Sequence, residues 1–247
     1  MWKILFLNLM IIGILSSTVN AFPSNVNIDV NYYSSKNNYS TWEDMVSVNP
    51  IQTQLYEMCR LELGTSINEV SETNYLQKSD RQFGGDNVIA YNSVFNFLNI
   101  NEINFNETAR LEFYQGKLEN VRFKFDMNGE VLKNILISKW GTPASSIVIA
   151  DKTRYTWKNG DYEARLLTDG NEGSLVFFYM PYAENANEVK RLAYAKHLKN
   201  APEAVNRLES LVKNSPQFKE SFKLELQNDP EYAQALQEAG MDMSIFN

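Results

Sequence analysis

The segment Thr153–Leu167 most constrains what this chain can fold into, because it has the pattern of a β-hairpin. Two runs rich in β-branched and aromatic residues flank the dipeptide Asn159-Gly160. Asn-Gly between such runs is typical of a two-residue turn in which both residues have positive φ. The sequence therefore predicts an antiparallel hairpin in which Trp157 pairs with Tyr162.

This register sorts the hairpin residues into an apolar face and a charged face. Tyr155 and Trp157 lie on the apolar face, which we expect to cover a core rather than to form an aromatic ligand platform. Arg154, Glu163 and Arg165 lie on the charged face, with the two arginines directly opposite each other. We expect this face to meet water or a partner. It is either a basic binding spot for a carboxylate or an acidic partner loop, or a solvated face on which Glu163 offsets the repulsion.

Regular elements are predicted on both sides of the hairpin. Apolar residues at positions 132, 136 and 140 have helical spacing, and Gly141 and Pro143 follow the last of them. Because Gly can close a helix and Pro cannot continue one, the pattern predicts a helix that ends at Lys139-Trp140. The segment Ser174–Met180 is apolar on both faces, which predicts a strand that is central or covered on both sides.

The region before this helix shows a similar order of helices and strands. Pro50 opens a predicted helix that Gly64 ends, and Ser66 and Glu69 form a capping box for a second short helix. Runs of apolar residues predict three strands, over about 86–97, 109–114 and 117–125. The sequence thus predicts an α+β fold in which helices pack on an antiparallel β-meander sheet.

The composition changes to helix-forming residues from Glu184 onward. Pro202, Pro216 and Pro230 recur at a spacing of 14 residues, and Pro at the first helical position costs no hydrogen bond. The spacing predicts a C-terminal extension of short Pro-capped helices, each with an apolar stripe. The repeat resembles the Asn/Asp-Pro helical repeats of co-chaperone domains, which implies a groove for apolar segments. The alternative is a helical cap that packs on the domain or on itself.

The N-terminus has the pattern of a secretory signal peptide. Lys3 precedes an apolar run, and Val19 and Ala21 stand where a signal peptidase reads small residues. The run is too short to span a membrane comfortably. We therefore expect cleavage after Ala21, export to the periplasm or the extracellular space, and no stable membrane insertion after cleavage.

The net charge and the small number of cysteine and histidine residues argue against several functional classes. The formal net charge is −7, which disfavours nucleic acid and anionic membranes as partners. Cys59 is the only cysteine and His197 the only histidine, so the sequence offers neither an intramolecular disulfide nor a structural zinc site. We expect a buried thiol at Cys59 rather than a bridge between two copies. We expect no cofactor and no catalytic motif, because the sequence selects no pair of carboxylates for hydrolysis.

Two short motifs carry a resemblance to known proteins. Leu63–Val70 resembles the helix-joining Gly-x-Thr/Ser-x-x-Glu-Val motif of the outer-membrane-assembly lipoprotein family and the β-lactamase-inhibitor-protein fold. Lys139–Pro143 is similar to the helix-ending Gly-x-Pro of such small exported α+β domains. The resemblance covers about residues 50–182 and implies a helix-on-sheet fold whose relatives bind proteins. The chain departs from it in lacking a lipid-anchor cysteine and the disulfides of the inhibitor fold.

These observations predict an organisation and a function. Residues 1–21 form a signal peptide, 22–48 an Asn/Ser-rich leader, 49–183 an α+β domain and 184–247 a helical C-terminal extension. The predicted function is that of an exported protein-binding or accessory protein of the cell envelope or periplasm, in an inhibitor, immunity-like or assembly role. A carboxylate-dependent hydrolase and a structural envelope component are the alternatives. A deep cleft with two convergent carboxylates would favour the hydrolase.

Overall fold

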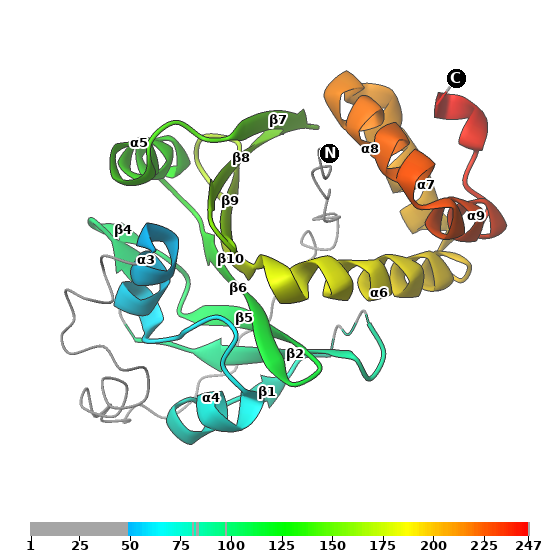
Figure 1. Ribbon diagram of the computed structural model, residues 1–247. Coiled ribbons are helices and arrows are strands. Elements are labelled where there is room, and N and C mark those ends of the chain that lie inside the picture. Colours follow the sequence, from blue (N-terminus) through cyan, green and yellow to red (C-terminus); the bar gives the residue numbers. More distant parts are fainter. Residues whose placement is uncertain (1–48, 81, 83, 97, 247) are drawn as a thin grey trace.

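An eight-stranded antiparallel sheet with helices on both faces forms the centre of the molecule (Figure 1). The computed structural model describes residues 49–80, 82, 84–96 and 98–246. The predicted signal peptide and Asn/Ser-rich leader lie outside the described residues. Within the described part of the chain the predicted α+β class is confirmed.

The sheet joins two meanders side by side, in the strand order β1-β2-β5-β6-β10-β9-β8-β7. Its strands are β1 (Gln77–Lys78), β2 (Val88–Val94), β5 (Thr108–Tyr114), β6 (Lys117–Phe125), β7 (Ser145–Ile149), β8 (Lys152–Asn159), β9 (Tyr162–Thr168) and β10 (Gly173–Tyr179). A separate small hairpin consists of β3 (Asn99–Ile100) and β4 (Ile103–Asn104). The strand predicted to be central is β10, which lies between β6 and β9 and is buried on both faces.

The structure corrects the predicted register of the β8–β9 hairpin. Asn159 pairs with Tyr162, so the two-residue loop is Gly160-Asp161 and not Asn159-Gly160. Gly160 has a φ of 56°, but Asn159 remains in the strand, where Asn49 Nδ2 donates to its carbonyl and side-chain oxygens at 2.8 and 3.1 Å. A positive φ at the first loop residue alone fits a type II′ turn rather than type I′.

The register error leaves the predicted faces intact. Trp157 pairs with Ala164 instead of Tyr162, and Arg165 pairs with Thr156 instead of Arg154. Because side chains alternate along a strand, a shift of two residues keeps each side chain on its own face. The apolar face therefore covers a core, as predicted, and the charged face lies on the other side of the sheet.

The main core lies between the apolar face of the sheet and two helices, α3 (Pro50–Cys59) and α5 (Gly129–Trp140). As predicted, α5 ends at Trp140, and the carbonyl of Gly141 then accepts a hydrogen bond from Trp157 Nε1 at 2.8 Å. In contrast, α3 ends before the predicted Gly64, because Arg60 adopts the left-handed conformation after Cys59. Cys59 is a buried free thiol, and burial raises its pKa to about 12.

A short helix, α4 (Ile67–Thr73), follows α3. It begins with the predicted capping box, in which Ser66 Oγ accepts from the Glu69 backbone N–H and the Glu69 carboxylate accepts from the Ser66 N–H. This reciprocal pair satisfies donors that have no partner inside the helix.

The C-terminal helices form a second core on the opposite side of the sheet. They are α6 (Met180–Leu198), α7 (Pro202–Asn214), α8 (Pro216–Asn228) and α9 (Pro230–Glu238), followed by a 3-10 turn (Met243–Phe246). Three of them start at a proline, as predicted. Their apolar stripes pack together through Leu208, Phe222 and Leu236, which are fully buried. This packing favours the helical cap over an open groove. None of the helices described here has the length and apolarity needed to cross a bilayer.

Candidate functional site

The charged face of the β8–β9 hairpin is buried, and the prediction that it meets water or a partner is wrong. Arg154, Glu163 and Arg165 are only 2%, 1% and 4% exposed. The sheet face that carries them is covered by the C-terminal helices of the same chain (Figure 1). The charges of two carboxylates act on Arg154, that of Glu163 on the neighbouring strand and that of Glu225 on α8.

Two cross-strand rows of polar residues extend this face over the sheet. The first row holds Arg110, Arg122, Arg165, Thr156 and Ser145, and it is interrupted only by Val176. The second row holds Glu112, Asn120, Glu163 and Lys158, and it is interrupted only by Phe178. Together with Arg154 and Glu119 from the sheet, and with Lys190, Arg191 and Glu225 from the helices, we name these residues the charged layer.

At one end of the charged layer, two glutamates converge on one lysine. A β-bulge next to Glu112 gives β6 an extra residue, so that Glu119 as well as Asn120 reaches the side of the sheet that faces α6. Lys190 Nζ lies 2.5 Å from Glu112 Oε2 and also pairs with Glu119 Oε1. Asn120 Nδ2 donates to both carboxylates, at 2.9 and 2.7 Å.

The surroundings move the pKa values of these two glutamates in opposite directions. Burial raises the pKa of Glu119 to about 7, although Lys190 opposes the shift. Burial also acts on Glu112, but the charges of Lys190, Arg110 and Arg122 outweigh it and hold its pKa well below the usual range. Two neighbouring carboxyl groups whose pKa values differ in this way can act as acid and base when a substrate reaches them. Here both carboxylates are buried beneath α6, so in this conformation they bind the helix to the sheet.

At the other end of the charged layer, α6 and α8 are joined by an arginine. Arg191 contacts Glu225 Oε1 at 3.2 Å and Asp229 Oδ2 at 3.0 Å. Burial raises the pKa of Glu225 to about 7 against the opposing charge of Arg191. On the sheet, Arg165 pairs with Glu163 and lies 4.5 Å from the Phe178 ring centre. Burial lowers the pKa of Arg154 to about 10, and the neighbouring charge of Arg165 adds to that effect.

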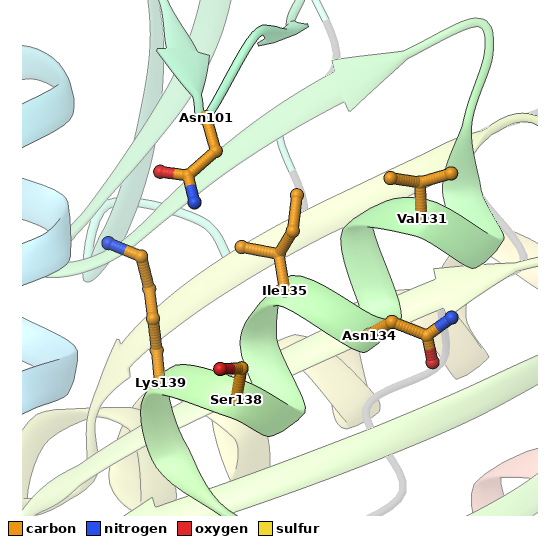
Figure 2. A pocket seen from close by; sticks show the side chains of 6 residues that line it. All are labelled: Asn101, Val131, Asn134, Ile135, Ser138 and Lys139. Atoms are coloured by element: carbon orange, nitrogen blue, oxygen red, sulfur yellow. The ribbon is translucent and has the colours of Figure 1, made fainter.

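An open hollow lies on the other side of the molecule, between α5 and the β3–β4 turn. It has a volume of about 370 Å³, and its lining residues are Asn101, Val131, Asn134, Ile135, Ser138 and Lys139. Figure 2 shows Asn101 on the turn, above Ile135 and the extended side chain of Lys139 on α5. Asn101 and Glu102 both have positive φ, which gives the tight turn that brings Asn101 over the helix.

The sequence pattern does not predict this hollow. The helical spacing predicts the core-facing residues of α5, but no pattern predicts the β3–β4 hairpin, whose strands have only two residues each. The Asn101-Glu102 turn was the available signal, because Asn adopts positive φ more readily than most residues. Within the described ranges no group of three or more His, Cys, Asp or Glu side chains is placed to hold a metal ion.

Comparisons with known proteins add no family to these observations. No protein-family model, no curated protein and no solved structure matches the chain.

Proposed function

We propose that this protein is an exported, non-catalytic binding protein that holds a segment of a partner protein in the hollow between α5 and the β3–β4 turn. The observation that carries the proposal is the contrast between two surfaces. The charged layer is covered by the protein's own helices. The hollow, in contrast, is open, and its lining combines apolar side chains with amide, hydroxyl and ammonium groups. Export rests on the signal-peptide pattern of the sequence.

The lining of the hollow indicates the chemistry of the partner segment. Val131 and Ile135 supply an apolar surface, and Met127, in the loop before α5, is 59% exposed. Around them, Asn101, Asn134 and Ser138 offer amide and hydroxyl groups that can bond to a peptide backbone. An apolar centre with a polar rim is the usual composition of a protein–protein contact.

Lys139 gives the hollow its only charge among the lining residues. It forms no ion pair with any residue in the described part of the chain, whereas its neighbour Lys133 on α5 pairs with Glu130. The hollow therefore fits a segment that places an apolar side chain on Val131 and Ile135 and a carboxylate on Lys139. A volume of about 370 Å³ is near the lower end of the range of about 300–1,000 Å³ for ligand pockets, which suits a short segment.

The test is selection of binding peptides from a displayed random library, with the mature full-length chain as bait. We expect the enriched peptides to share an apolar residue next to Asp or Glu. Binding of these peptides should be lost in Val131→Asp, which places a charge on the apolar surface. Binding should weaken in Lys139→Glu, because the carboxylate introduced at position 139 repels the carboxylate of the peptide.

A matched control is Leu224→Asp, which adds the same charge at an exposed leucine of α8 in the other helical layer. This variant should bind the selected peptides like the unmodified chain. Equal binding by Val131→Asp and Leu224→Asp would show that the peptides bind elsewhere and would overturn the proposal. A library that yields no enriched sequence would do the same.

A carboxylate-dependent hydrolase is the second candidate, and the opposite pKa shifts of Glu112 and Glu119 are the observation that favours it. It requires α6 to move away so that a substrate can reach the two carboxylates. Hydrolysis of a chromogenic glycoside or ester that disappears in Glu119→Gln, with folding intact, would support this candidate over the binding protein.

A further inference from the structure

The geometry points to a binding site for a small oxyanion, such as phosphate, inside the charged layer between strands β7–β9 and helix α8. Its ligands are the side chains of Ser145, Arg154, Thr156 and Arg165. This site is separate from the hollow at α5 and does not depend on the function proposed for that hollow.

The four side chains come together because of the strand register. Ser145 on β7 is the cross-strand partner of Thr156 on β8, and Thr156 is the partner of Arg165 on β9. Arg154 lies two residues before Thr156 and therefore on the same face of β8. Helix α8 packs against β7 at this end of the sheet, with Ser215 Oγ donating to the carbonyl of Val148 at 2.8 Å.

Each of the four side chains has a buried polar atom that lacks a hydrogen-bond partner within the described part of the chain. These atoms are Ser145 Oγ, Arg154 Nε, Thr156 Oγ1 and Arg165 Nη1. Arg154 is 2% exposed and forms no ion pair there. A buried donor without an acceptor is costly, and folded proteins satisfy nearly all such groups. Four unsatisfied groups on three adjacent strands indicate that something else supplies the acceptors.

The local charges indicate that the missing acceptor is an anion. On the sheet, the carboxylate of Glu163 is already shared between Arg165 and Lys158, the latter at 3.1 Å. From the helices, Glu225 binds Arg191 through Oε1 and leaves Oε2 without a hydrogen-bond partner in the described part of the chain, and Asp229 binds the same arginine. At this end of the layer four positive side chains stand against three carboxylates, and Arg154 is the one that forms no ion pair within the described part of the chain. The four are Arg154, Lys158, Arg165 and Arg191, and the three are Glu163, Glu225 and Asp229.

An oxyanion satisfies this arrangement better than water does. Guanidinium groups bind the oxygens of phosphate and carboxylate with short, charge-assisted hydrogen bonds, often two at a time. The hydroxyls of Ser145 and Thr156 can donate to the remaining oxygens. Water could accept from the same donors, but it would leave one buried positive charge in excess at this end of the layer.

The test is titration of the mature full-length chain with inorganic phosphate, after dialysis against a phosphate-free buffer. Calorimetry should show one saturable site, and the melting temperature should rise with phosphate but not with chloride at equal ionic strength, because a ligand that binds only the folded state stabilises it. Arg154→Met should weaken phosphate binding at least about tenfold. Thr156→Val keeps the shape of the side chain, removes one donor, and should also weaken binding.

Arg207→Gln is the control, because it removes a positive charge from an exposed position on α7. It should bind phosphate like the unmodified chain. If acetate binds more tightly than phosphate at the same site, the natural ligand is a small carboxylate, and the oxyanion site stands. If phosphate gives no more stabilisation than chloride, water fills the site and the inference fails. It also fails if Thr156→Val binds phosphate as tightly as Arg207→Gln, and this variant decides the question if Arg154→Met does not fold.

Discussion

The Nζ atom of Lys190 on α6 lies 2.5 Å from Oε2 of Glu112 on β5, and this contact fastens the C-terminal helices to the sheet. Glu119 reaches the same lysine because a β-bulge lets it share the face of its neighbour Asn120. Charged groups that are buried between two layers depend on one another, since removing one leaves its partner without water or a counterion. The charged layer therefore ties the C-terminal helices to one position on the sheet.

Replacing Lys190 by methionine should destabilise the protein strongly. Two buried carboxylates would lose their shared cation, and breaking a buried ion pair on one side costs about 3 kcal/mol or more. The free energy of unfolding, measured by chemical denaturation, should fall accordingly. Lys196→Met, at an exposed position of the same helix, should change it little. Equal effects of the two substitutions would contradict the role assigned to Lys190.

The stability of the protein should fall as pH rises from about 5 to 8, in part because of Glu119. Burial raises the pKa of this carboxyl from 4.5 to about 7, so the folded state binds more protons than the unfolded state between these values. The stabilisation is complete below pH 4.5 and is lost as pH rises through 7. Glu119→Gln should flatten the dependence of unfolding free energy on pH. Glu225, with a similarly raised pKa, should leave part of the slope.

A control for this pH experiment is Glu231→Gln, at an exposed position of α9. It should keep the pH slope of the unmodified chain. A slope that is the same in Glu119→Gln and Glu231→Gln would show that Glu119 titrates alike in the folded and unfolded states.

The hairpin turn should tolerate asparagine at position 160 but not valine. Gly160 has a φ of 56°, and a Cβ at this position would meet no other atom within 4 Å. The cost of substitution is therefore conformational and not steric. Gly160→Val should destabilise by about 1–2 kcal/mol, whereas Gly160→Asn should cost less, because Asn adopts positive φ more readily. If both variants melt at the same temperature, the turn does not depend on this conformation.

The alternation of residues was enough to assign the two faces of the hairpin but not its register. A tertiary contact overrides the local preference of Asn159-Gly160, because Asn49, which caps α3, binds Asn159 and keeps it in the strand. In the same way Ser215, at the N-cap position of α8, does not cap the helix with its side chain but donates to Val148 on the edge strand β7. Contacts between residues so far apart in the sequence leave no local pattern.

The charged layer was missed for a related reason. The sequence placed Arg154, Glu163 and Arg165 on one face, and charged residues are ordinarily exposed. What buries them is the docking of α6 and α8, which bring their own charges in Arg191 and Glu225. The prolines predicted the helices themselves, but neither proline spacing nor apolar stripes indicate which face of a sheet a helical layer covers.

The most direct test of the structural account is the thermal stability of a fragment of residues 22–183, which lacks Lys190, Arg191 and the helices α7–α9. The C-terminal helices form a packed layer of the fold. We therefore expect the fragment to melt at a much lower temperature than the chain of residues 22–247, or to aggregate, because the charged face and the apolar residues Val176 and Phe178 become exposed. A soluble fragment with an unchanged melting temperature would contradict this, since it would show that the C-terminal helices add nothing to the stability of the sheet.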